Sequence, residues 1–156
     1  MALLADSNDF VRIDIARFGE LINVILSRKT SEKVSVLSQM DAVLEMSDEY
    51  YVDEEIVGYD RVTKALIPRN AFREAVANAL VHRRWDLKGN KVGMYDDRAE
   101  IASPGGLPDG VAEDEYVAGG PSISRNPTLA NVLYRLRYIE RFGAGIPRII
   151  WEREDS

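Results

Sequence analysis

The chain has 156 residues, 46% of them hydrophobic, which suits a single domain, or one domain with a piece of another. It has no cysteine and one histidine, which excludes a disulfide framework, a thiolate metal site and a multi-histidine metal site. The net charge of −6 lies in residues 1–66, where 7 Lys and Arg face 13 Asp and Glu, since residues 67–156 carry 13 of each. Because DNA-binding domains usually present a basic face to the phosphates, direct nucleic-acid binding by this chain is not expected.

Nothing in the sequence resembles a targeting or membrane segment. The N-terminus, MALLADSNDF, lacks the charged start and the apolar stretch of a signal peptide. No apolar run approaches the roughly 18 residues that a membrane-spanning helix needs. Together with the absence of cysteine, which fits a reducing compartment, this predicts a cytoplasmic protein with no membrane partner.

The start of the chain predicts a strand followed by a short helix. Apolar and polar residues alternate over positions 11–15, which is the period of a strand. Residues 20–29 are expected to form the helix. A polar break follows, in which Thr30 or Ser31 would serve as N-cap for the next element.

Residues 34–66 predict a second helix and a further strand. Apolar residues recur at helical spacing over residues 34–46. The acidic run at residues 48–55 is interpreted as a solvated connection. Residues 56–66 are rich in β-branched and aromatic residues and are expected to form a strand or a long hairpin arm.

Residues 67–86 predict one helix, with Pro68 in the first helical position, where its missing N–H costs nothing. Glu74, Asn78 and His82 follow one another at intervals of four, so they stack in one line on one helix face. Alanine and valine border this polar line, whereas the border of a solvated face is usually charged. The line is therefore either a ligand site or a set of polar groups that cap neighbouring segments from a partly buried helix.

The rest of the chain predicts a hairpin, a glycine loop and two helices. Residues 91–95 and 98–103 read as the hairpin strands, and the Gly- and Pro-rich loop after them needs an unusual backbone path. Residues 111–125 have no period and are typical of a lid or binding loop. A helix is expected to start at Asn126 and Pro127, and a last one to occupy residues 146–152.

Two glycine turns are candidate binding elements. Gly105 and Gly106 let backbone N–H groups approach a ligand closely. Gly143 and Gly145 precede the last helix, whose N-terminus would suit an anion. A plain turn in the first case, and a corner between helices in the second, are the alternative explanations.

This order of elements resembles that of the GHKL ATPases, which include gyrase, Hsp90-type chaperones, histidine kinases and mismatch-repair ATPases. Residues 56–151 resemble more closely the divergent GHKL-like domain described as "RecG-like helicase C-terminal". Proteins with this domain are commonly transcriptional regulators in which a Schlafen-like AlbA domain precedes it. The matching motifs are EAVANALVHR (74–83), YDDRAEIASPGGLPDGV (95–111), SRNPTLANVL (124–133) and IERFGAGIPRI (139–149).

The resemblance implies an α+β fold, a two-layer GHKL ATPase-like sandwich. Its sheet is mixed or mainly antiparallel, with helices on one face. The GHKL-like domain is expected in residues 56–156. Residues 1–55 are then the tail of a preceding domain plus connecting helices.

The resemblance also implies roles for individual residues in binding ATP with Mg²⁺. Glu74 matches the general base, and Asn78 matches the Mg²⁺ ligand. Gly105 and Gly106 match the turn under the adenine. The residues expected near the phosphates are Ser124, Arg125 and Asn126 at the end of the lid, and Gly143 and Gly145 in the second glycine turn.

One position departs from the pattern of the active ATPases. Their DxGxG motif has an aspartate that accepts a hydrogen bond from the adenine amino group, and Ser103 stands at that place here. A serine can still pair with the amine, but it is an uncharged acceptor. A mismatched polar group in a binding site can cost a few kcal/mol.

Two functions follow from these observations. The first is an ATP-binding module of a transcriptional regulator, with weak ATPase activity left open. The second is a degenerate GHKL scaffold that serves dimerisation or interdomain signalling without nucleotide turnover. In either case the expected partners are a second copy, as a homodimer, and DNA only through domains outside this chain. A helicase motor is excluded, because the sequence has no Gly-Lys-Ser/Thr run to hold the phosphates.

Overall fold

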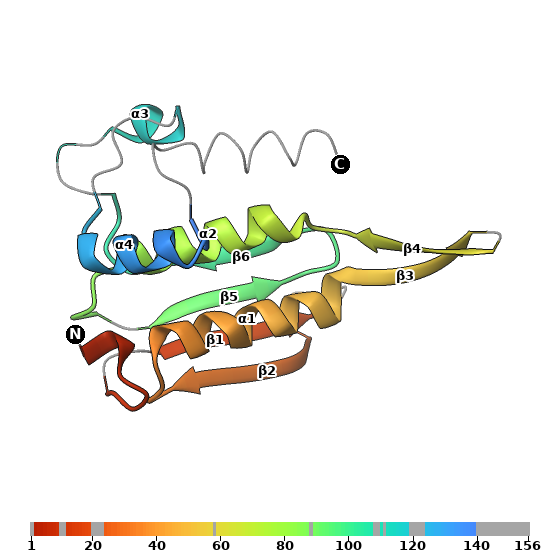
Figure 1. Ribbon diagram of the computed structural model, residues 1–156, viewed down its shortest axis with the longest axis horizontal. Helices are drawn as coiled ribbons and strands as arrows, with labels where there is room; N and C mark the ends of the chain where they lie inside the picture. Colours follow the sequence, from red (N-terminus) through yellow and green to blue (C-terminus); the bar gives the residue numbers. More distant parts are fainter. Residues whose placement is uncertain are drawn as a thin grey trace.

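The computed structural model describes residues 2–9, 12–19, 24–57, 59–87, 89–107, 110, 112–118 and 124–139. These residues form a mixed four-stranded sheet with helices packed on one face, and a two-stranded hairpin that projects from one end (Figure 1). The predicted fold class, α+β with helices on one face of a mixed sheet, is confirmed. No helix in these ranges is long and apolar enough to cross a bilayer.

The sheet has the strand order β2-β1-β5-β6. The central pair, β1 and β5, is parallel, and both outer pairs are antiparallel. In β1 the alternation of Ile13 and Ile15 with polar neighbours turns one face toward the helices, as predicted. The strands are β1 (Arg12–Phe18), β2 (Ile25–Glu32), β5 (Asn90–Met94) and β6 (Ala99–Ala102).

The predicted helix over residues 20–29 is wrong, because residues 25–32 form β2, an edge strand. Its backbone pairs with β1 from Arg12↔Glu32 to Phe18↔Ile25. Two of the apolar residues that suggested a helical face, Val24 and Ile25, stay at the surface, where they are 43% and 53% exposed. Pairing with the neighbouring strand thus outweighed the local helical spacing.

Helix α1 (Val36–Tyr51) confirms the second predicted helix and extends it to Tyr51. The predicted N-cap at Thr30 or Ser31 is wrong, because both residues lie in β2. Ser35 is the cap, and its Oγ accepts a hydrogen bond from the backbone N–H of Ser38 at 3.1 Å.

The acidic run at 48–55 is not a solvated connection. It completes α1 and enters β3 (Val52–Val57), which pairs antiparallel with β4 (Asp60–Ala65). The helix extends this far because Tyr51 is anchored: it is 1% exposed and its hydroxyl donates to the carbonyl of Arg98 at 2.8 Å. The predicted hairpin arm at 56–66 is confirmed in β4, and residues 56–57 belong to β3.

The predicted central helix is α2 (Arg69–Val81), and it is five residues shorter at its C-terminus than expected. Pro68 is the N-cap rather than the first helical residue, and His82 is the C-cap. The chain leaves the helix where Arg83, although charged, is buried with its guanidinium 4.5 Å from the ring centre of Trp85. Because residues two apart do not face each other on an α-helix, this contact requires a backbone that has left the helix.

The predicted hairpin of β5 and β6 and the helix start at Asn126 are confirmed. Asn126 is the N-cap of α4 (Pro127–Arg135), with Pro127 in the first turn. Residues 111–125, predicted as a lid or binding loop from their lack of a period, contain the short helix α3 (Glu113–Val117). A 3-10 turn, η1 (Ala2–Leu4), begins the described chain.

One hydrophobic core joins the sheet to the helices. Apolar residues of β1, β5, α1, α2 and α4 form a single cluster. Both predicted parts of the chain contribute to it, and the division into residues 1–55 and 56–156 stays a prediction. The most enclosed members include Ile13, Ile15, Met40, Val43, Leu80, Met94, Leu129 and Leu133.

Candidate functional site

The polar line of α2 lies largely inside the protein. Glu74 is 7% exposed, and its neighbours on the apolar border, Ala77 and Val81, are buried. Asn78 is half-buried one turn further on. A solvated helix face is therefore excluded at Glu74, as the apolar border of the line had indicated.

His82 ends the line at the C-cap of α2, where it is half-buried. Burial lowers the pKa of its imidazole, and the positive charge of Arg125 lowers it further. The imidazole is therefore neutral at pH 7. A neutral ring at a helix end suits a structural position better than a site for holding negative charge.

Ser103 connects the glycine loop to α2. Its hydroxyl donates to the carbonyl of Ala79 at 2.6 Å, and Ala79 directly follows Asn78 in the helix. Because the hydroxyl proton is used in this bond, the oxygen presents only acceptor lone pairs to any further partner. An adenine amino group donates hydrogen bonds and therefore needs an acceptor. Ser103 can be that acceptor, although it lacks the negative charge of an aspartate.

The glycine loop follows the unusual backbone path that was predicted. Gly105 has φ +120° and Gly106 has φ +57°, values that favour glycine. A Cβ on Gly105 would lie 2.7 Å from Nη1 of Arg125 and 2.7 Å from Cγ of Arg84. Gly105 thus lets two arginine side chains pack on the loop, whereas a Cβ on Gly106 would meet open space.

The residues just before α4 hold the loop against the end of α2. Nη1 of Arg125 donates to the carbonyls of His82 and Gly106, each at 3.0 Å, and Nη2 donates to that of Leu107 at 2.7 Å. Nδ2 of Asn126 donates to two further carbonyls near the helix end, those of Val81 (2.7 Å) and Arg83 (3.0 Å). We call Arg125 and Asn126 the carbonyl latch, because they satisfy acceptors that a helix C-terminus leaves unpaired.

Sequence reasoning placed the latch residues near phosphates and missed their bonds to carbonyls. The sequence signal that fits this role is an Arg-Asn pair directly before a proline that starts a helix. Ser124, the preceding residue, has a buried Oγ with no hydrogen-bond partner in the described part of the chain. A buried hydroxyl of this kind is an open polar position that a ligand could satisfy.

The structure therefore gathers most of the predicted site at one place. Ser103, Gly105, Gly106 and the latch surround the C-terminal end of α2, next to Asn78, and Glu74 lies one turn earlier. The second glycine turn, with Gly143 and Gly145, lies outside the described residues, as does the helix predicted at 146–152.

Residues 88–156 match the family model described as "Putative ATP-dependent DNA helicase recG C-terminal". The matched range includes the hairpin of β5 and β6, the glycine loop, the latch and α4, but not Glu74 or Asn78. The match confirms the resemblance to a divergent GHKL-like ATPase domain. The matched range is less than half of the chain, and the similarity to an ATPase-like domain holds over that range.

The crystal structure of the DIP2311 protein from Corynebacterium diphtheriae has a similar fold, with a TM-score of 0.79 and 26% sequence identity. The similarity covers 92% of this chain and 30% of that protein, so this chain spans less than a third of its length. It agrees with the GHKL-like α+β architecture. No curated protein matches this chain.

Proposed function

We propose that this chain is an ATP-binding module of the GHKL type, in a cytoplasmic transcriptional regulator whose DNA contacts come from other domains. The observation that carries the proposal is the bond from the Ser103 hydroxyl to the carbonyl of Ala79. It joins the glycine loop to α2 one residue after Asn78. The bond thus holds the glycine loop against the helix that carries the buried carboxylate of Glu74 and the amide of Asn78.

The glycine loop and the helix differ in chemistry, as the two ends of a nucleotide do. At the loop end, the lone pairs of Ser103 would accept from the adenine amine, and the space next to the Cα of Gly106 is open. At the helix end, the amide oxygen of Asn78 would hold Mg²⁺, which prefers oxygen ligands and bridges phosphates. Glu74 would orient a water and take its proton, because it is a buried carboxylate on the same line.

Isothermal titration with Mg²⁺-ATP and Mg²⁺-ADP tests this proposal directly. We expect Asn78→Ala to weaken ATP binding by about tenfold or more, because a ligand of the bridging ion is lost. Asn70→Ala is the matched control: it removes the same group from an exposed position of the same helix, and the affinity should not change. No heat from the intact protein at millimolar nucleotide would contradict the proposal.

The carbonyl latch supports the second function, a scaffold for homodimerisation or interdomain signalling. Arg125 and Asn126 direct five donated bonds to carbonyls of their own chain, as a purely structural corner would. If the chain is such a scaffold, Asn78→Ala should change the thermal stability or the sedimentation of the protein and leave its nucleotide affinity unchanged. Loss of ATP binding in that variant decides for the first function.

A further inference from the structure

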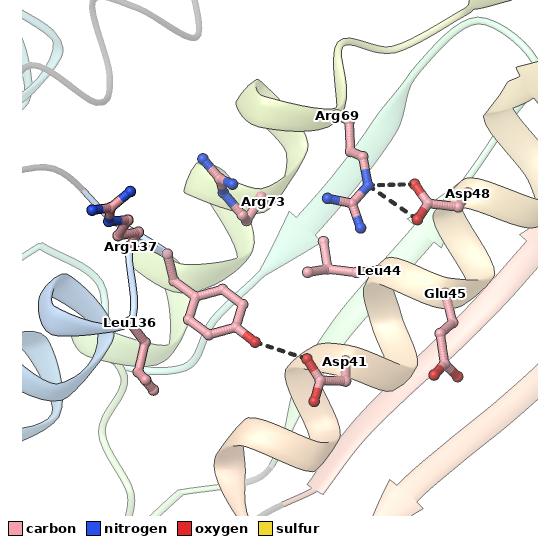
Figure 2. A pocket seen from close by; sticks show the side chains of 9 residues that line it. Asp41, Leu44, Glu45, Asp48, Arg69, Arg73, Leu136 and Arg137 are labelled. Atoms are coloured by element: carbon pink, nitrogen blue, oxygen red, sulfur yellow. Dashed lines mark hydrogen bonds and ion pairs between the residues drawn. The ribbon is translucent and has the colours of Figure 1, made fainter. Parts of the chain in front are cut away.

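A polar cavity of about 420 Å³ lies between α1, α2 and the turn that follows α4 (Figure 2). Helix α1 contributes the carboxylates Asp41, Glu45 and Asp48 to its wall, and opposite them stand three arginines. Neither the polar line, the glycine loop nor the latch takes part in it. The cavity is therefore separate from the nucleotide site proposed above. The arginines are Arg69 and Arg73 of α2 and Arg137 of the turn.

Some of the charged side chains that line the cavity are already paired with one another or with a hydroxyl. Nε of Arg69 donates to both carboxylate oxygens of Asp48, at 2.8 and 3.0 Å. Asp41 accepts a hydrogen bond of 2.9 Å from the hydroxyl of Tyr138. Both bonds cross the cavity and tie its walls together, and they occupy two of the three carboxylates.

Among the residues that the structure describes, Arg73 and Arg137 have no such carboxylate partner. Nε of Arg73 is buried and has no hydrogen-bond partner among the described residues, which is costly for a charged donor. Figure 2 shows the carboxylate of Glu45 turned away from both arginines, so it does not neutralise them. Two positive charges from different elements thus lie on one side of the cavity.

The backbone conformation of Arg137 is a second, independent indication that this side chain has a function in the cavity. Arg137 has φ +62°, in the left-handed turn that ends α4, where the amides of Arg137 and Tyr138 bond back to Tyr134 and Leu133. Glycine is the usual residue at this position because it has no Cβ to strain. An arginine kept in such a conformation indicates a role for its side chain.

We propose that Arg73 and Arg137 bind a phosphate dianion in this cavity. The planar guanidinium matches phosphate oxygens in pairs, and two positive charges suit a dianion better than a singly charged carboxylate. The cavity exceeds the size of a phosphate group, and the buried side chain of Leu44 and the ring of Tyr138 give it an apolar part. A phosphate monoester with an apolar group, or free phosphate, would present this chemistry.

Titration of the intact protein with orthophosphate and with phenyl phosphate distinguishes the two sources. Tighter binding of phenyl phosphate identifies a monoester, whereas equal affinities identify free phosphate as the ligand. We expect Arg73→Gln and Arg137→Gln each to weaken binding by about tenfold or more, since each removes a charge-assisted hydrogen bond. Arg135→Gln is the matched control, because it removes the same charge from an exposed position on α4 outside the cavity.

Arg137→Gly separates binding from folding. Glycine relieves the left-handed backbone, so this variant should melt at a higher temperature than the natural protein and still lose phosphate affinity as Arg137→Gln does. The proposal is overturned by unchanged affinity in Arg137→Gly, by an equal loss in Arg135→Gln, or by no binding of either phosphate at millimolar concentration.

Discussion

At the scale of single residues, the buried hydroxyl of Tyr51 makes two hydrogen bonds to the backbone. It donates to the carbonyl of Arg98 and accepts from the amide of Tyr95 at 3.1 Å, which joins the end of α1 to the turn between β5 and β6. Burial raises the pKa of this phenol above its ordinary value of 10, so the hydroxyl stays protonated at neutral pH. The hydroxyl is thus a permanent donor inside the protein.

Tyr51→Phe should lower the free energy of unfolding by about 1–3 kcal/mol, because a carbonyl and an amide lose their partner in a buried place. Urea unfolding followed by circular dichroism measures the change. Tyr59→Phe removes the same hydroxyl from a fully exposed residue between β3 and β4, and it should have no effect. An equal stability of the two variants would contradict the role given to Tyr51.

The single histidine makes a clean test of the electrostatics at the end of α2. Burial and the charge of Arg125 hold the pKa of His82 below its ordinary value of 6.5. The unfolded chain therefore binds a proton more readily than the folded protein. The contribution of His82 to stability is complete above pH 6.5 and is lost as the pH falls through the lower pKa of the folded state.

Proton NMR of the imidazole C2–H can follow this titration without overlap from another histidine. We expect a midpoint below 6.5 in the folded protein. The free energy of unfolding of His82→Gln should fall less between pH 7 and 5 than that of the natural protein. A midpoint at or above 6.5 would show that the ring is not held neutral.

At the scale of elements, the carbonyl latch decides how the glycine loop, α2 and α4 meet. The side chain of Asn126 does not bond to the first turn of its own helix. It donates instead to the carbonyls of Val81 and Arg83, for which α2 has no further turn to supply N–H donors. The start of one helix thus completes the end of another.

Asn126→Ala should lower the free energy of unfolding by about 1–3 kcal/mol, because two carbonyls lose their donor. Asn131→Ala is the matched control, an exposed position within α4, where alanine is the better helix former and stability should hold or rise slightly. Thermal unfolding of both variants gives the comparison. If Asn126→Ala melts with the natural protein, the latch contributes nothing to stability.

At the scale of the whole molecule, the elements that were predicted correctly are those that short sequence patterns within the element itself indicate. The alternation around Ile13 and Ile15 indicated β1, and Asn126 with Pro127 marked the start of α4. The apolar border of the polar line indicated that the line is not an ordinary solvated face, which the burial of Glu74 bears out. In each case the residues concerned lie within one or two turns or one strand of each other.

The predictions that failed concern segments whose structure depends on distant partners. Residues 25–32 carry no signal of their own for a strand, and they form one because β1 offers a free edge. The length of α1 depends on Tyr51 reaching a carbonyl 47 residues away. A local pattern cannot report such a contact, since the partner is brought near only when the sheet has formed.

The sequence by itself determined the α+β class through its resemblance to the GHKL-like domain. It also determined the helix with its polar line and the glycine loop, because periodicity and glycine content act through local backbone preferences. Only the tertiary structure decided which other segments these elements contact. It directed Ser103 and the latch to carbonyls of α2, and it gathered Arg73 and Arg137 at one cavity from elements about sixty residues apart. The direction of hydrogen bonds and the meeting of like charges are properties of the packed chain, because they depend on which segments lie against each other.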